Sequence, residues 1–193
     1  MKYAKKFNSE VMKYSVDSLP LTHNEKLKIN SIFEGSGSYD STLVCVGCFL
    51  SNSEDSIFYK MNNYEVKIKK IAFQGKNHLI NRFEDMVFEI DNRVVFGVRY
   101  YKKEIPETEL CCFDVLYNGE KIDFSKPHWG NFYNPRIGCI KDALGLYCQT
   151  NMHYDKEYNN IYIYLKGADG GSGYSVIFVF KKDKYIGKVI YVP

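Results

Sequence analysis

The sequence has a single tryptophan, only five prolines and no hydrophobic run long enough to cross a bilayer. Its 26 basic and 23 acidic side chains are interleaved, so the net charge of +3 does not build the basic patch that nucleic acids require. The glycine-rich stretch 167–173 lacks the Gly-Lys-Ser/Thr ending of a phosphate loop and the spaced carboxylates of a calcium loop. The sequence therefore predicts no membrane span, no nucleic-acid partner and no cofactor.

Tyrosine and phenylalanine are abundant, with 17 and 13 residues, and hydrophobic side chains make up 45% of the chain. This composition is that of a globular protein, and aromatic residues favour strands over helices. A length of 193 residues suits one domain. We therefore expect a single domain over residues 1–193, with a helical segment at 1–34 and an antiparallel β domain at 42–192.

The C-terminal stretch has the clearest pattern. Runs 161–165, 174–180 and 185–192 are rich in β-branched and aromatic residues, and a glycine-rich turn and a charged turn separate them. This pattern is typical of an antiparallel meander. The middle run is hydrophobic on both faces, with Phe178 on one side and Val179 on the other. A strand of this kind must be covered on both faces, so we expect it near the centre of a sheet.

Turn signals predict further hairpins upstream. Asn62-Asn63, the segment Asp91 to Arg93, and Asn118-Gly119 each separate two strand-like runs. Asn-Gly is the strongest short hairpin signal, because both residues tolerate positive φ. Residues 149–160 are polar and without periodicity, so they are expected to form an exposed loop.

Two short helices are expected at the N-terminus. One face of residues 2–15 is hydrophobic at helical spacing. Thr22 and Glu25 have the spacing of a capping box that starts a second helix, and Gly35 supplies its end. Both helices are expected to cover one face of the sheet, with an arm for a partner protein as the alternative. The fold class is thus mainly β (α+β), an antiparallel curled sheet or sandwich with two short N-terminal helices.

The first ten residues begin with basic side chains but lack the hydrophobic segment of a signal peptide. The expected location is the cytoplasm. A chain from which a signal peptide had been removed would look the same and would be periplasmic.

The cysteines do not form a complete metal-ligand set. Cys45 and Cys48 are spaced as in a zinc knuckle, but no second C-x-x-C pair follows. Most of the six lie in hydrophobic strand-like runs, so we expect reduced, buried thiols. Cys139 and Cys148 flank a turn, and only geometry decides whether they pair as a disulfide. The six are Cys45, Cys48, Cys111, Cys112, Cys139 and Cys148.

A Cys–His hydrolase is one alternative function, and it would need a histidine beside one of these cysteines. The sequence around the cysteines does not resemble a cysteine-protease or amidase signature. The candidates are His23, His78, His128 and His153.

One aromatic segment outside the strands is the best candidate for a binding site. The only tryptophan lies there between turn-forming residues. Trp, Tyr and Arg dominate the energetics of protein–protein interfaces. The alternative is that these rings cap one end of the core. We predict a partner-binding site composed of His128, Trp129, Phe132, Tyr133 and Arg136.

The C-terminal pattern Gly-Gly-Ser-Gly-Tyr-Ser-Val-Ile-Phe-Val-Phe, followed by Lys-Tyr-Ile-Gly-Lys-Val-Ile, resembles the ending of small bacterial β proteins. Some proteins of that kind are immunity partners of secreted toxins. The resemblance covers residues 161–192 and implies a fold ending rather than a set of functional residues.

The expected function is a non-enzymatic protein-binding module, and its most specific form is an immunity protein that neutralises a bacterial toxin by occluding it. A phage or viral anti-defence protein is the other alternative, because it would share these sequence features. The expected partner is another protein, and the sequence leaves its identity and the oligomeric state open.

Overall fold

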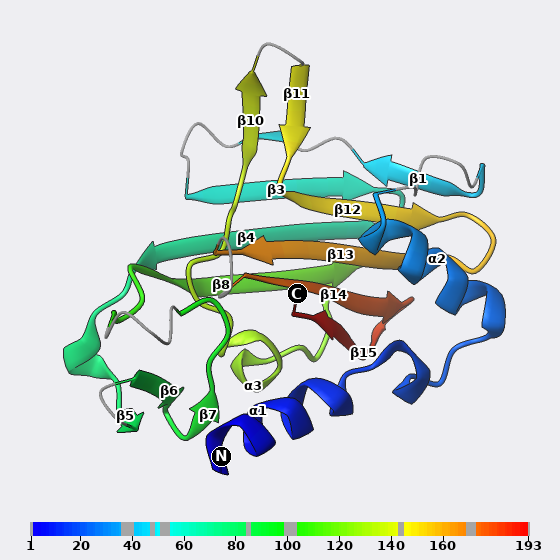
Figure 1. Ribbon diagram of the computed structural model, residues 1–193. Coiled ribbons are helices and arrows are strands. Elements are labelled where there is room, and N and C mark those ends of the chain that lie inside the picture. Colours follow the sequence, from blue (N-terminus) through cyan, green and yellow to red (C-terminus); the bar gives the residue numbers. More distant parts are fainter. Residues whose placement is uncertain are drawn as a thin grey trace.

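The computed structural model describes residues 2–35, 41–46, 49–50, 55–83, 86–98, 104–142, 145–168 and 173–192, and it is mainly β with few helices (Figure 1). The helical elements are α1 (Lys2–Lys13), η1 (Val16–Ser18), α2 (His23–Phe33), η2 (Gly75–Asn77) and α3 (Lys126–Trp129). The strands are β1 (Leu43–Val46), β2 (Phe49–Leu50), β3 (Ser56–Met61), β4 (Tyr64–Ala72), β5 (Ile80–Phe83), β6 (Met86–Ile90), β7 (Arg93–Val94), β8 (Thr108–Tyr117), β9 (Glu120–Lys121), β10 (Cys139–Asp142), β11 (Gly145–Cys148), β12 (Thr150–Asp155), β13 (Asn160–Gly167), β14 (Tyr174–Lys181) and β15 (Lys184–Tyr191).

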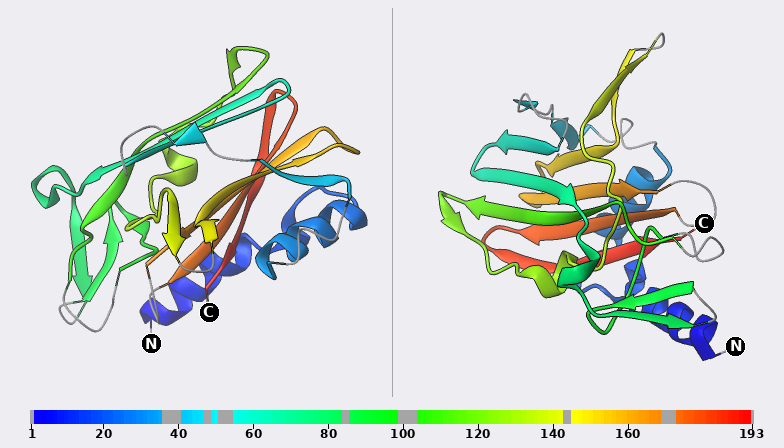
Figure 2. Two further views of the ribbon diagram at one scale, coloured as in Figure 1. Left: turned by 90° about the horizontal axis from the view of Figure 1, so that it is seen from above. Right: turned by 90° about the vertical axis from the view of Figure 1, so that its left-hand side faces the viewer.

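Two five-stranded antiparallel sheets form the body of the protein. Sheet I has the order β1-β12-β13-β14-β15, and sheet II has the order β2-β3-β4-β8-β9. The two sheets face each other, and α2 lies on the side of sheet I that faces away from sheet II (Figure 2). A small sheet, β5-β6-β7, and the hairpin β10-β11 complete the described strands. The predicted mainly β fold with antiparallel sheets is confirmed.

Strand β14 lies between β13 and β15, and both of its faces are buried as predicted. Phe178 and Phe180 belong to the inner core between the two sheets. Ile177 and Val179 belong to a second cluster on the outer face of sheet I, together with Ile29 of α2. One face of β14 is covered by sheet II and the other by α2. The hydrophobic residues on both faces are therefore buried, as the sequence pattern predicts.

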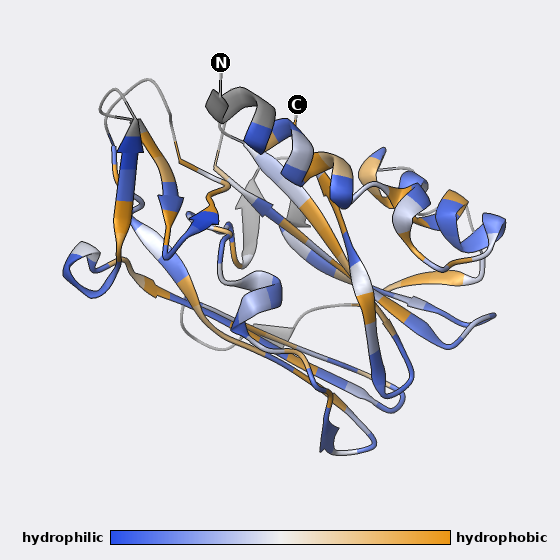
Figure 3. Ribbon diagram, turned by 90° about the horizontal axis from the view of Figure 1, so that it is seen from below, coloured by the Kyte–Doolittle hydropathy of each residue, from blue (hydrophilic) through white to orange (hydrophobic). Residues whose placement is uncertain are grey.

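The inner core is dense in aromatic rings. The Phe178 ring centroid lies 5.0 Å from that of Phe113 on β8 and 5.5 Å from that of Phe124, in edge-to-face geometry. Along several of the strands, hydrophobic residues alternate with hydrophilic ones (Figure 3). The strand β4 shows the consequence, because Val66 and Ile68 are fully buried while Lys67 between them is exposed.

The three predicted hairpins are present. Residues Asn62, Asp91, Asn92 and Asn118 adopt φ of 50°, 53°, 62° and 53°, and Gly119 adopts 82°. These left-handed conformations close β3-β4, β6-β7 and β8-β9. Asn, Asp and Gly tolerate this region at low cost, so each turn is encoded locally.

The prediction of an exposed loop over 149–160 is wrong, because Thr150–Asp155 forms β12 inside sheet I. Two of its polar residues, Thr150 and Asp155, are fully buried and hydrogen-bonded instead of solvated. The Thr150 hydroxyl donates to the carbonyl of Arg136 at 2.7 Å, and Asn160 donates to the Glu25 carboxylate at 2.6 Å. A strand is predicted from the alternation of hydrophobic and polar residues. Polar residues at buried positions, bonded to distant partners, break that alternation.

Helix α2 is the predicted capped helix and covers the outer face of sheet I. Thr22 and Glu25 form the reciprocal capping box, and Gly35 follows the helix at φ 71°. A buried ion cluster fixes the helix to sheet I: Lys28 Nζ lies 2.9 Å from a carboxylate oxygen of Asp155 and 2.9 Å from one of Glu157.

Helix α1 differs from the prediction, because it does not cover the same face as α2. Its hydrophobic residues Phe7 and Val11, with Tyr14 just beyond it, pack against the inner core. The Phe7 ring lies 5.5 Å from that of Phe96, and the Tyr14 carbonyl accepts from the Ile190 amide at 3.0 Å. The helix therefore closes one end of the sandwich beside the edge strand β15. None of the helices in the described ranges is long and hydrophobic enough to span a membrane.

Candidate functional site

The aromatic segment predicted to bind a partner lies mostly inside the protein. Trp129, Phe132 and Tyr133 are only 6%, 1% and 2% exposed. Phe132 stacks on Phe96 at 5.3 Å, whereas Tyr133 belongs to a separate cluster under the small sheet. These rings are therefore buried in this structure and offer little surface to a partner.

The segment is buried because its backbone pairs with the chain around Phe96. The Tyr133 amide donates to the Phe96 carbonyl at 2.9 Å, and the Phe96 amide donates to the Asn131 carbonyl at 3.0 Å. The next residue, Gly97, has φ 89°, and a Cβ there would lie 2.1 Å from the Tyr133 carbonyl oxygen. A side chain would separate the two segments, so this glycine permits the close approach.

The other two predicted residues, His128 and Arg136, are half-buried and do not gather with the rings at a common surface. The Arg136 amide donates to the Lys166 carbonyl at 2.8 Å, which fixes this end of the segment to β13. Trp129 and Phe132 belong to the inner core. This agrees with the alternative that the rings of the segment cap the core.

The expectation of buried thiols is wrong for the cysteines whose side chains the structure describes. Cys45 and Cys111 are exposed, and Cys112 is half-buried. Cys111 lies where the register between β4 and β8 shifts, and such a bulge turns a side chain away from the core. Cys48 falls outside the described residues. The backbone register places Cys139 opposite Cys148 in the hairpin β10-β11.

One cysteine and one histidine are paired across strands. Cys45 on β1 lies opposite His153 on β12, so the two residues share the outer face of sheet I. Burial lowers the pKa of His153 to about 4, which keeps the imidazole neutral at physiological pH. A weakly basic imidazole is a poor partner for activating a thiol.

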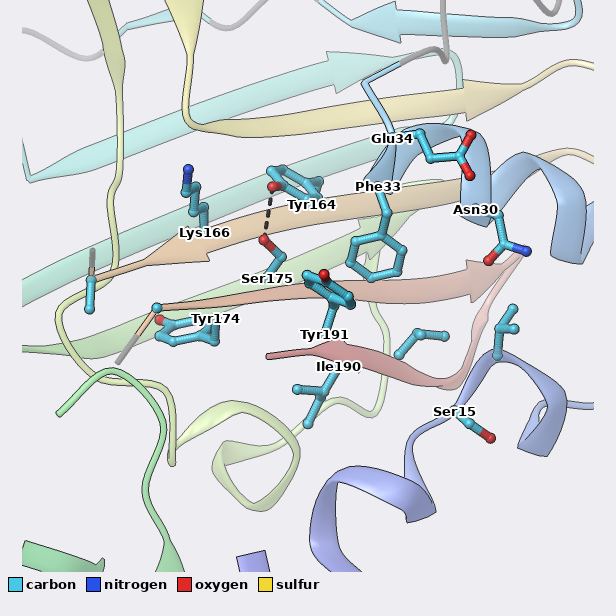
Figure 4. Close-up of a pocket in the computed structure, with 14 residues that line it drawn as sticks. Ser15, Asn30, Phe33, Glu34, Tyr164, Lys166, Tyr174, Ser175, Ile190 and Tyr191 are labelled. Carbon is cyan, nitrogen blue, oxygen red and sulfur yellow. Dashed lines mark hydrogen bonds between the residues drawn. The ribbon is translucent and has the colours of Figure 1, made fainter. Parts of the chain in front are cut away.

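The outer face of sheet I carries the larger candidate site, a groove between α2 and the ends of β13, β14 and β15. Its volume is about 890 Å³. It lies beside the part of the sheet that α2 leaves uncovered (Figure 4). Residues that shape it include Asn30, Phe33, Tyr164, Lys166, Ser175 and Tyr191.

Three aromatic rings define the wall of the groove. The Phe33 ring lies 6.2 Å from that of Tyr164 and 6.2 Å from that of Tyr191. Tyr191 is 57% exposed, an unusual value for a large aromatic side chain, and Phe33 and Tyr164 are half-buried. The Tyr164 and Ser175 hydroxyls hydrogen-bond to each other at 2.9 Å. The groove thus offers apolar surface with a polar pair at its floor.

Charges of opposite sign flank the rings. Lys166 on β13 and Glu34 at the end of α2 are both exposed, and they lie toward opposite ends of the groove (Figure 4). Sequence reasoning missed this site, because its residues come from segments more than a hundred positions apart. The available signal was that Tyr162 and Tyr164 make the outer face of β13 apolar as well as its inner face.

A histidine cluster elsewhere has a structural role. His78 contacts a carboxylate oxygen of Asp91 through Nδ1 at 2.8 Å and one of Glu109 through Nε2 at 3.1 Å. Its ring stacks on Phe73 at 4.7 Å, and its side chain is only 6% exposed. Burial alone would lower the pKa of His78, but the bonds to the two carboxylates outweigh burial and raise it. The cluster fixes the segment before β5 to β6-β7 and β8.

This raised pKa predicts a pH-dependent stability. The cluster contributes its full stability below the unfolded pKa of about 6.5 and loses it as pH rises through the higher folded value. The loss of free energy of unfolding caused by His78→Gln should therefore be larger near pH 6 than near pH 9. Urea unfolding of both proteins across this range measures the difference, and a difference that does not change with pH would contradict the assignment.

Within the described residues, no group of three or more His, Cys, Asp or Glu side chains is arranged to hold a metal ion. Comparison with protein families, with curated proteins and with solved structures finds no match to this chain.

Proposed function

We propose that this protein is a binding module that takes a segment of a partner protein in the groove on the outer face of sheet I. The exposure of the Phe33, Tyr164 and Tyr191 rings around a volume of about 890 Å³ carries the proposal. Aromatic side chains bury large areas at low entropic cost, and they are enriched where interfaces gain their binding energy.

The charges at the two ends of the groove indicate the chemistry of the segment. An acidic residue would pair with Lys166 and a basic residue with Glu34. Between them an apolar or aromatic side chain would contact the three rings and displace water. The proposed occupant is therefore a short segment with an apolar residue between an acidic and a basic one.

The more specific form of this proposal is an immunity-type protein that neutralises a bacterial toxin by occluding it. Occlusion needs a firm surface contact and no catalysis, and the aromatic lining of the groove supports this form of the proposal. Co-expression with a candidate secreted toxin tests it: the wild-type chain should restore growth, and Tyr191→Ala should restore it less. Growth arrest that the wild-type chain leaves unchanged would contradict this form of the proposal. A phage or viral anti-defence protein remains the alternative, and it would bind a host defence protein instead.

The groove itself predicts the effect of a substitution. Tyr191→Ala should weaken binding of the partner segment by about thirtyfold, because an interfacial aromatic anchor contributes about 2 kcal/mol. A displayed peptide library with an aromatic residue fixed between acidic and basic positions supplies the ligands. Leu27 is 52% exposed on α2 and is not among the residues that line the groove, so Leu27→Ala is the matched control. Equal binding by both variants, with urea stability unchanged, would place the interface elsewhere.

The Cys–His hydrolase is the rival function. Among the described residues, Cys45 and His153 are the one cysteine and histidine that lie directly opposite each other on paired strands. The low pKa of His153 weakens this reading, because the imidazole cannot hold the proton of the thiol at neutral pH. The groove therefore remains the better-supported site.

A further inference from the structure

A second site lies at the other side of β15, where a lysine is buried in the inner core. Lys188 is only 4% exposed and lies opposite Phe178 in the register of β14 and β15. Its Nζ donates to the His128 carbonyl at 2.7 Å and lies 4.5 Å from the ring centroid of Tyr14 and 4.9 Å from that of Phe132. Lysine is seldom buried without a paired charge, so this placement calls for an explanation.

No carboxylate among the described residues lies within salt-bridge distance of Lys188. The nearest acidic influence is Glu10 of α1, which already contacts Lys13 at 2.9 Å and the Tyr14 hydroxyl at 3.3 Å. Arg93 acts in the opposite sense and adds positive charge. Burial is the main influence and lowers the pKa of Lys188 to about 8. Burial therefore favours the neutral amine and outweighs the opposing influence of the Glu10 carboxylate.

A small cavity reaches this lysine. It has a volume of about 250 Å³, and its wall includes Lys188 itself together with Tyr14 and His128, two of the three residues that contact Nζ. Ser18 at its edge is exposed, so the cavity is open to solvent. The lining residues include Lys13 but no aspartate or glutamate.

The imidazole of His128 adds a proton carrier. Burial, and then the charge of Lys188, lower the pKa of His128, so the ring is neutral at physiological pH. It lies over Tyr185, with ring centroids 4.7 Å apart, and both residues line the cavity. An amine and an imidazole whose pKa values are both lowered by burial in one cleft are a feature of functional sites.

We propose that Lys188 is a nucleophilic amine that forms an imine with a small carbonyl compound bearing a carboxylate. The cavity provides the space, its lining of Lys13 without any aspartate or glutamate favours an anion, and Lys188, which has no carboxylate partner among the described residues, provides the reacting nitrogen. A desolvated lysine beside other cations is the setting in which proteins activate an amine toward carbonyl groups. This activity is separate from the groove and does not depend on it.

The step balances without an oxidant or a metal. The neutral amine attacks the carbonyl carbon, a C–N bond forms, and the carbonyl electron pair moves to oxygen, which takes up a proton. The nitrogen gives up its first proton to form the carbinolamine; the hydroxyl then takes up a second proton and leaves as water while the nitrogen gives up its second proton, so that a C=N bond replaces the C=O bond. His128 lines the cavity and can carry these protons. The products are one imine and one water molecule.

The test uses the native protein with glyoxylate and cyanoborohydride at about pH 7.5, followed by peptide mass spectrometry. Lys184 lies on the same strand and is exposed, so it serves as the internal reference. At this pH about a quarter of an amine with the pKa of Lys188 is neutral, against about one in a thousand for an ordinary lysine. Lys188 should be labelled more than about tenfold faster than Lys184. A smaller ratio overturns the proposal, because a lysine that is merely buried reacts more slowly than an exposed one.

Two further arms test the cavity and the class of compound. Ser18→Phe places a ring at the cavity edge and should slow labelling of Lys188 while labelling of Lys184 stays unchanged; equal labelling of Lys188 would overturn the cavity as the route. Glycolaldehyde is a neutral aldehyde of nearly the same size as glyoxylate. Its Lys188-to-Lys184 ratio should be lower, and an equal ratio would overturn the preference for a carboxylate.

Discussion

Phe178→Ala should lower the free energy of unfolding by about 3–5 kcal/mol, the range for removing a fully buried aromatic side chain. Phe178 is 0% exposed and packs against Phe113, Phe124 and Phe132 from sheet II and the segment between the sheets. Alanine would leave a cavity among these rings, which their own packing against the core allows to relax only in part. A domain of this kind is stable by about 5–15 kcal/mol, so the loss is a large share.

Urea unfolding monitored by circular dichroism measures this effect. Ser175→Ala on the same strand is a control, because Ser175 is half-buried on the outer face and its removal leaves no cavity in the core. The control should shift the free energy of unfolding by about 1 kcal/mol or less. A midpoint for Phe178→Ala equal to that of the wild type would mean that β14 is not the central strand.

Asp155→Ala should cost a similar amount, about 3–5 kcal/mol, for an electrostatic reason. Asp155 is 0% exposed and accepts from Lys28 Nζ at 2.9 and 3.0 Å, from the Glu157 amide at 3.0 Å and from the Tyr162 hydroxyl at 3.2 Å. Alanine would leave the Lys28 ammonium buried with only the half-exposed Glu157 as a counter-charge. Four donors, these three and the Tyr158 amide, would lose their acceptor at once.

An exposed ion pair provides the comparison. Lys60 lies 2.6 Å from Glu65 on the surface, and Lys60→Ala should change stability by less than about 1 kcal/mol, because water screens the pair. The double variant Lys28→Met with Asp155→Leu removes both charges together. It should be less destabilised than Asp155→Ala alone, since no buried charge remains unpaired. A double variant that is the less stable of the two would show that packing rather than charge dominates this cluster.

Loss of this cluster should also affect the proposed binding site. Lys28 fixes α2 to β12, and the same helix carries Phe33 at the edge of the groove. A loosened helix would no longer hold the Phe33 ring 6.2 Å from Tyr164 and Tyr191. Stability must therefore be measured beside binding, so that a variant that unfolds is not counted as one that lost an anchor.

The local elements of this fold could be predicted from the sequence. The capping box of Thr22 and Glu25, the turns at Asn62 and Asn118, and the two-faced strand around Phe178 are all present. Each depends on neighbouring residues alone: a hydroxyl reaching the third amide, a residue that tolerates positive φ, or a side-chain alternation along one strand. These features do not require any contact with a distant part of the chain.

The tertiary structure decided what is buried, and with it where the sites lie. The segment around Trp129 has the composition of an interface, yet it is buried because Gly97 lets the Phe96 backbone pair with it. The sequence of β12 predicts a loop, because the polar residues Thr150 and Asp155 are buried there and hydrogen-bonded to residues outside the strand. The groove and the Lys188 cavity likewise join residues from opposite ends of the chain. Sequence patterns carry short-range preferences, whereas the burial of a polar or aromatic side chain depends on partners that only the folded chain brings together.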